Sequence, residues 1–138
     1  MVSPEKLLIL LNGTNRLFIQ YANKVLSDSG CPVGYLQFVA LKAIGEIKVG
    51  SVLSIKKIAD SIGIERSTLS HNSDILQRDG YIIKISQRPG FTTLCLTDLG
   101  KTVVFRWEKT YQDITKNSVC GVSDKFGDDL ERIGRNLL

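Results

Sequence analysis

The sequence predicts a single, mainly α-helical domain with one small β-hairpin. Apolar residues recur at helical spacing in six segments, and two segments that alternate apolar and polar residues flank Pro89 and Gly90. The chain has 138 residues, the usual size of one domain, and no linker or internal repeat divides it. We therefore treat residues 1–138 as one domain.

Two helices are expected in the first third of the chain. Ser3 can cap the first, because a proline at the first helical position and an acid in the first turn follow it, and this helix can continue to about Ser27. The second should cover roughly residues 33–48. Its apolar residues recur at the spacing of one buried helical face: Leu36, Val39, Ala40, Ala43, Ile44 and Ile47. The segment 51–53 that follows is short and β-prone.

A third helix, a tight turn and a fourth helix come next. Ser54 can cap the short third helix, and Gly63 can end it. The fourth helix begins almost at once and is expected over about Arg66–Asp79, where Gly80 ends it.

Two β-prone segments predict the hairpin, and two more helices complete the chain. The strands are expected at Tyr81–Ser86 and Phe91–Leu96, joined by Gln87–Gly90, whose central Pro-Gly pair favours a type II turn. Thr97 and Ser123, each followed by an aspartate, are expected to cap the fifth and sixth helices.

Composition excludes several classes of function. The 18 Lys and Arg against 14 Asp and Glu give a net charge of +4, which favours nucleic acid or another anionic surface as a partner. There is one histidine, and the three cysteines are widely spaced without a Cys-x-x-Cys motif, so we expect no metal ion and no cofactor. No nucleophile–base pair or phosphate-binding loop is visible, and we do not expect an enzyme. The longest apolar run, Leu7–Leu11, is too short to span a bilayer, and no export signal opens the chain, so we expect a cytoplasmic protein.

Helix, tight turn, helix and hairpin in this order are the layout of a winged helix-turn-helix, in which the second helix of the pair can enter the major groove of DNA. The helical period turns Leu69 and Leu76 of the fourth helix inward, with Ser73 between them. Five polar residues then face outward: Ser67, Ser70, His71, Asp74 and Arg78. The small hydroxyls of the first half can approach base edges closely, whereas Asp74 should repel phosphate and keep the last turn away from DNA.

At this point the sequence resembles a known family. IADSIGIERSTLSHN (58–72), LQRDGYI (76–82) and LCLTDLG (94–100) together look like the MarR family of transcriptional regulators. The resemblance implies a winged helix-turn-helix over about residues 33–100. It also implies a homodimer that binds palindromic double-stranded DNA, and many members are repressors relieved by small phenolic or lipophilic molecules or by thiol oxidation.

The resemblance also implies that the helices outside the winged core, over about residues 3–30 and 101–138, join the two subunits. The surplus of apolar residues near both ends of the chain favours the same arrangement, because large exposed apolar patches mark interfaces. The family's peroxide sensors carry a reactive cysteine inside the first helix. Here the cysteines are Cys31, Cys95 and Cys120, none of them in that helix, so we do not expect cysteine sensing.

The predicted DNA contacts fall into two groups. Sequence readout is assigned to the presented face of the fourth helix: Ser67, Thr68, Ser70 and His71. Positioning on phosphate is assigned to the cations around it: Arg66, Lys56 and Arg88. The family usually has a wing arginine where this chain has Gly90, and we expect Arg88, two residues earlier, to replace it.

Two alternatives stay open at this stage. The protein is either a DNA-binding regulator or a winged-helix module that contacts other proteins, in which case the hydroxyl-rich helix face is merely solvated. Trp107 and Tyr111, four residues apart, either line a ligand pocket or pack in the core or a dimer interface.

Overall fold

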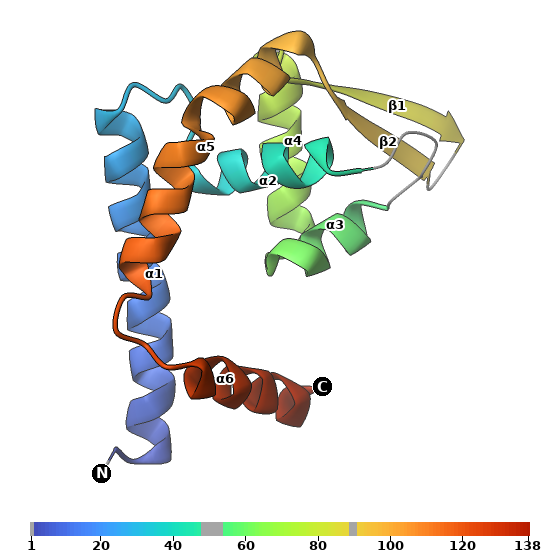
Figure 1. Cartoon of the computed structure of the whole chain (residues 1–138). Helices are drawn as coiled ribbons and strands as arrows, with labels where there is room; N and C mark the ends of the chain where they lie inside the picture. The colour runs from blue at the N-terminus through green and yellow to red at the C-terminus, as the bar shows by residue number, and fades with distance from the viewer. Residues whose placement is uncertain (1, 48–53, 89–90) are drawn as a thin grey trace.

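The computed structural model describes residues 2–47, 54–88 and 91–138, which form six helices and a two-stranded antiparallel hairpin (Figure 1). In chain order the elements are α1 (Pro4–Asp28), α2 (Tyr35–Gly45), α3 (Ile55–Ile62), α4 (Arg66–Arg78), β1 (Ile82–Arg88), β2 (Phe91–Leu96), α5 (Asp98–Ser118) and α6 (Asp124–Leu137). The predicted fold class, mainly helical with a hairpin wing, is confirmed.

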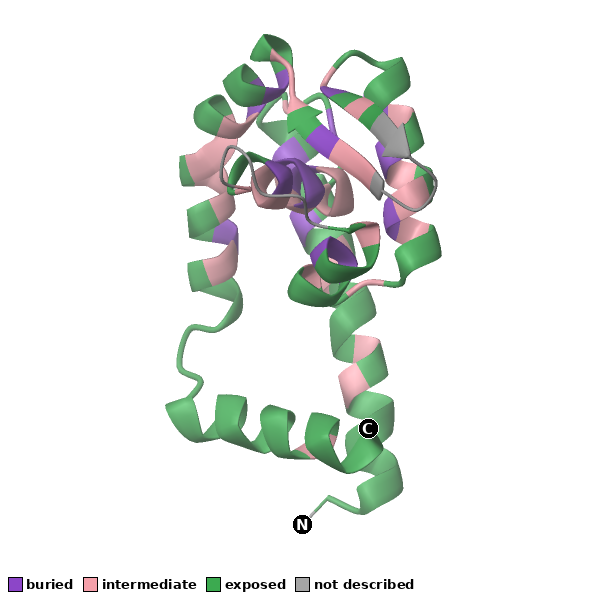
Figure 2. Cartoon of the chain, turned by 90° about the vertical axis from the view of Figure 1, so that its right-hand side faces the viewer, coloured by how far each residue is buried: buried purple, intermediate pink, exposed green. Residues whose placement is uncertain are grey.

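The elements form a packed body with a long extension (Figure 1). Helices α2, α3 and α4 and the hairpin make the body, while α1 and α5 contact each other and run in opposite directions, and α6 lies near the N-terminal half of α1. Buried residues gather in the body, and α6 and the first half of α1 are almost wholly exposed (Figure 2). The largest fully buried side chains are Phe38, Leu26, Leu41, Ile58, Leu69, Leu76, Ile82, Leu94 and Ile114.

Local rules explain the helix-turn-helix. The Ser54 hydroxyl accepts the Lys57 N–H at 3.2 Å and so caps α3, as predicted. Gly63 ends α3 with φ of +72°, a left-handed conformation that costs glycine little, and its N–H donates to the Asp60 carbonyl at 3.3 Å. The prediction that Leu69 faces the core is confirmed, since its side chain is fully buried.

The predicted elements need three corrections, two of them to boundaries and one to a cap. Helix α2 begins at Tyr35 rather than at 33, where the Asn23 side chain accepts the Tyr35 N–H at 2.7 Å, and it ends at Gly45 rather than near 48. Strand β1 continues to Arg88, which pairs with Phe91, so it is two residues longer at this end than the predicted strand. The third correction concerns Ser123, which stands before α6 as predicted but whose hydroxyl makes no capping hydrogen bond. The expected turn at 89–90 and the β-prone segment 51–53 lie outside the described residues.

Aromatic side chains join the middle of α5 to α2 and to the end of α1. The Tyr111 ring stacks on Tyr35 with 6.4 Å between centroids and lies 5.4 Å from the Phe38 ring. The Trp107 indole N–H donates to the Ser29 carbonyl at 3.2 Å, at the end of α1. Of the two alternatives for Trp107 and Tyr111, these contacts favour packing.

Candidate nucleic-acid interface

Helix α4 is held on the body by one apolar side and presents the other. Leu69, Ser73 and Leu76 are buried against the core, and the Ser73 hydroxyl donates to the Ser70 carbonyl at 2.9 Å, so its burial leaves no unpaired donor. On the other side, Arg66, Ser67, His71, Asp74 and Arg78 are exposed, while Thr68 and Ser70 are half-buried. The outward set predicted from the helical period therefore matches the structure, with Ser70 nearer the body than the others.

The N-terminus of α4 can receive an anion. Glu65 stands at the capping position, but its side chain accepts no capping hydrogen bond, so the first-turn N–H groups have no side-chain cap. These N–H groups point out of the helix start, where the helix dipole favours negative charge. Arg66 is the first residue of the helix and is exposed beside them.

A hollow of 330 Å³ joins the starts of α3 and α4 to the wing. Its walls come from three elements and are formed by Ser54, Ile55, Lys56, Arg66, Ser70 and Thr92. Three of the predicted contact residues thus line one surface feature: two cations and one hydroxyl. Such a combination suits a phosphate, which accepts hydrogen bonds from cationic and hydroxyl donors.

Of the other predicted contact residues, those on α4 do not line the hollow. Ser67, Thr68 and His71 lie on α4 itself, one turn or less from the hollow residue Ser70. Arg88 ends β1, but its side chain lies outside what the structure describes, and its contact with DNA stays a prediction. Sequence reasoning missed Thr92 in the wall of the hollow, because its place depends on the hairpin register, in which Ser86 pairs with Thr92.

The acid on α4 is not isolated. The Lys84 ammonium, from β1, forms an ion pair with the Asp74 carboxylate. This hydrogen bond, and then the attraction between the two charges, lowers the pKa of Asp74 below its ordinary value, so the carboxylate stays ionised beside its partner. A phosphate that approaches Asp74 therefore meets a pair of opposite charges rather than a lone carboxylate, so the expected repulsion is reduced.

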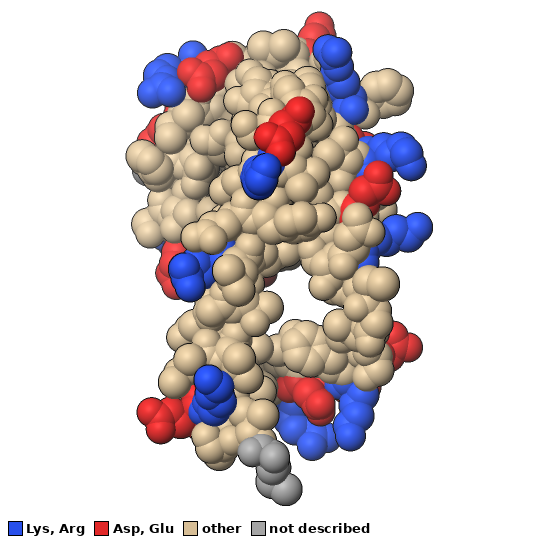
Figure 3. Space-filling model, turned by 90° about the vertical axis from the view of Figure 1, so that its left-hand side faces the viewer, with Lys and Arg blue, Asp and Glu red and all other residues tan. Residues whose placement is uncertain are grey.

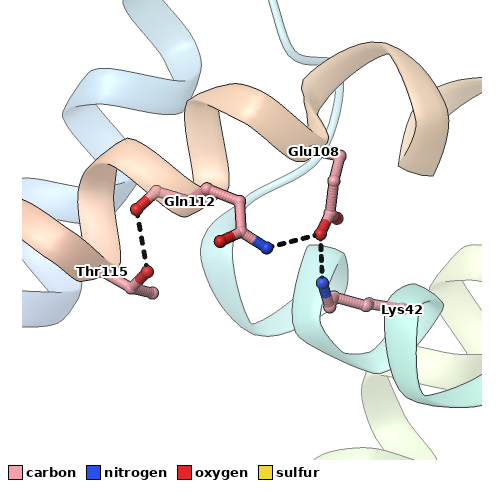
Figure 4. A network of polar contacts seen from close by, with 4 residues as sticks. All are labelled: Lys42, Glu108, Gln112 and Thr115. Atoms are coloured by element: carbon pink, nitrogen blue, oxygen red, sulfur yellow. Dashed lines mark hydrogen bonds and ion pairs between the residues drawn. The ribbon is translucent and has the colours of Figure 1, made fainter.

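A second polar network ties α5 to the body (Figure 4). The Lys42 ammonium, from α2, forms an ion pair with Glu108 of α5, and the Gln112 amide donates to the same carboxylate oxygen at 2.9 Å. The hydrogen bond from Lys42 holds the pKa of Glu108 below its ordinary value, although partial burial opposes this. The network is structural in character, because it fixes α5 against α2.

The charged side chains, the Cys31 thiol and the potential metal ligands elsewhere in the described residues indicate no second site. On the α1 side, basic and acidic side chains are interspersed and separated by uncharged surface (Figure 3). Burial raises the pKa of the Cys31 thiol, which disfavours the reactive thiolate. Within the described ranges, no three His, Cys, Asp or Glu side chains lie close enough to hold a metal ion. None of the helices described there is long and apolar enough to cross a membrane.

A helix-turn-helix followed by a hairpin, framed by long helices at both ends of the chain, defines the winged helix-turn-helix class, which is confirmed for this chain. No family model matches the sequence, and no curated protein matches it either. Solved structures do match. The M. tuberculosis transcriptional regulator MosR superposes with a TM-score of 0.79 at 22% identity, over 94% of this chain and 93% of MosR.

Two other similar structures were solved with a ligand bound. S. aureus MepR, solved as a complex with DNA, has a TM-score of 0.77 at 17% identity, with coverage of 94% of this chain and 96% of MepR. The M. tuberculosis MarR-family protein Rv2887, solved with salicylic acid, has a TM-score of 0.59 at 15% identity, with coverage of 94% and 93%. At these identities the likeness establishes that the chain has the fold of MarR-type regulators.

Proposed function

We propose that this protein is a DNA-binding transcriptional regulator that acts as a homodimer in the cytoplasm, without enzymatic activity. The observation that carries the proposal is the hollow at which Lys56, Arg66 and Ser70 meet the wing, beside the exposed face of α4. The fold shared with MepR, whose structure was solved with DNA, supports it. On this surface, Ser67, Thr68 and His71 would contact the bases. Arg88 would contact the DNA backbone or the minor groove.

The finer parts of the proposal rest on the resemblance to the MarR family. We propose a palindromic operator, because two subunits related by a two-fold axis present two equivalent α4 helices. We also propose repression, relieved by a small lipophilic or phenolic molecule. The salicylic acid bound to Rv2887 supports a ligand of this class.

Duplex DNA in a fluorescence-anisotropy titration tests the proposal. Binding to a mixed-sequence duplex should weaken steeply between about 50 and 200 mM salt, because phosphate contacts release counterions. The rival function, a winged-helix module that contacts proteins, predicts no such salt-dependent binding. Recovery of bound genomic fragments with the purified protein would then identify the operator.

The dimer is proposed from exposed apolar residues on the first half of α1 and on α6, segments that are almost wholly exposed in one chain (Figure 2). Along α1, Ile9 and Leu17 are 56% and 58% exposed, and in α6 Leu137 is 79% exposed. Surfaces of this kind on the same end of a molecule mark an interface with a partner. Sedimentation at micromolar concentration should therefore give twice the chain mass of 15.3 kDa, and a monomer would contradict the proposal.

His71 offers a test of sequence readout. Its exposed imidazole lies on the presented face of α4, where it can hydrogen-bond a base edge. His71→Ala should weaken binding to the selected operator by about 1–3 kcal/mol and relax the base preference there, while affinity for random duplex changes little. Equal losses on both duplexes would instead make His71 a phosphate contact.

A further inference from the structure

The presented face of α4 carries one acid among its polar residues. Asp74 lies three, four and seven residues after His71, Ser70 and Ser67, so all four share a helix face, and the Asp74 side chain is 69% exposed. A carboxylate at this place lies within a Debye length of a phosphate that approaches Ser70 or His71, because residues three or four apart on a helix face are about 5–6 Å from each other and that length is about 8–10 Å at ordinary salt. Such a charge opposes DNA binding unless something compensates it.

Lys84 is placed to compensate it. The hairpin register puts Lys84 opposite Leu94, on the inner side of the wing with Ile82, and its side chain is only 18% exposed. Its ammonium contacts the Asp74 carboxylate, and its backbone N–H donates to the Gln77 side-chain carbonyl at 2.9 Å. One residue of β1 therefore holds two residues of α4, once by its charge and once by its main chain.

We propose that Lys84 is a positioning residue that masks the charge of Asp74, so that DNA can approach the presented face of α4. The inference rests on the proposed DNA-binding function. Lys84 acts through Asp74 and need not touch DNA, because its ammonium is mostly covered and already paired. The rival role is a direct phosphate contact by Lys84, and the two roles make opposite predictions for a double variant.

The test compares four variants with the wild-type chain by anisotropy titration on a mixed-sequence duplex over a series of salt concentrations. Lys84→Met exposes an unpaired Asp74 to phosphate and should weaken binding about fivefold at low salt. Asp74→Asn removes the acid and should bind no more weakly than wild type. The double variant Lys84→Met/Asp74→Asn should recover to within about twofold of Asp74→Asn, and Lys84→Arg, which keeps the charge, should bind like wild type.

The outcomes separate the roles. A double variant as weak as Lys84→Met, with a salt slope lower by about one per subunit, would make Lys84 a phosphate contact and overturn the inference. An unchanged affinity for Lys84→Met would overturn it as well. No salt-dependent binding by the wild-type chain would overturn the proposed function, and the inference with it.

Two controls test whether the loss of any Lys–Asp ion pair, or a loss of folding, explains the result. Lys24→Met/Asp28→Asn removes another Lys–Asp ion pair, an exposed one on α1 with 3.1 Å between Nζ and Oδ2, and should leave DNA binding unchanged. Circular dichroism and thermal unfolding of each variant show whether it is folded. If Lys84→Met fails to fold, Lys84→Gln, which can still donate a hydrogen bond to Asp74, takes its place with the same expected rescue by Asp74→Asn.

Discussion

Gly100→Ala is expected to destabilise the protein by about 3 kcal/mol or more, which lowers the thermal midpoint by about 10 °C for a chain of this size. Gly100 is buried in the first turn of α5, where a Cβ would overlap the Tyr81 carbonyl oxygen and lie 3.2 Å from the carbonyl carbon. That carbonyl cannot move freely, because it accepts the Thr97 N–H at 3.0 Å. The added methyl must therefore push α5 away from the segment between α4 and β1.

The matched control is Gly127→Ala in α6, where a Cβ would meet nothing within 4 Å. Because alanine is the better helix former, this variant should be equally stable or more stable by up to about 1 kcal/mol. Both variants are compared with wild type in thermal unfolding at one protein concentration, since subunit association makes the midpoint concentration-dependent. A Gly100→Ala protein as stable as wild type would show that α5 and the segment before β1 do not pack as closely as described.

The double substitution Lys56→Gln/Arg66→Gln is expected to reduce DNA affinity about a hundredfold or more at low salt. Both cations line the hollow between α3, α4 and the wing, and both are exposed. If each contacts one phosphate in each subunit of a dimer, four contacts are lost and the salt slope should fall by about 3.6. Folding should be unaffected, because neither side chain contributes to the core.

Lys109→Gln/Lys116→Gln is the control of equal charge change. Both lysines are exposed on α5, outside the hollow, so the net charge falls by the same amount while the proposed phosphate contacts remain. Its salt slope should match that of wild type. If both double variants lose affinity equally, binding depends on net charge alone and the hollow is not a phosphate site.

Much of the fold followed from patterns within short segments of sequence. The caps at Ser3, Ser54 and Thr97 and the stop at Gly63 were predicted and are confirmed, because a cap or a left-handed glycine depends on neighbours within a few residues. The buried side of α4 was likewise predicted from its 3.6-residue period.

Boundaries that depend on distant residues were predicted wrongly. The start of α2 is set by Asn23 from α1, a contact across twelve positions of the chain, so a local pattern placed it at residue 33 instead. The sequence pattern ended the first strand at Ser86, whereas pairing with β2 carries β1 to Arg88, opposite Phe91.

The candidate site divides in the same way. The sequence alone determined which residues of α4 face outward, since helical geometry decides this. It also showed that Lys56 precedes this helix and that Arg66 begins it. Only the tertiary structure decided that Lys56, Arg66 and Ser70 border one hollow with Thr92, and that Asp74 is paired with Lys84. The physical reason is that a hollow and an ion pair are made by residues from different elements, whose meeting depends on how the hairpin packs on α4 and not on any local pattern.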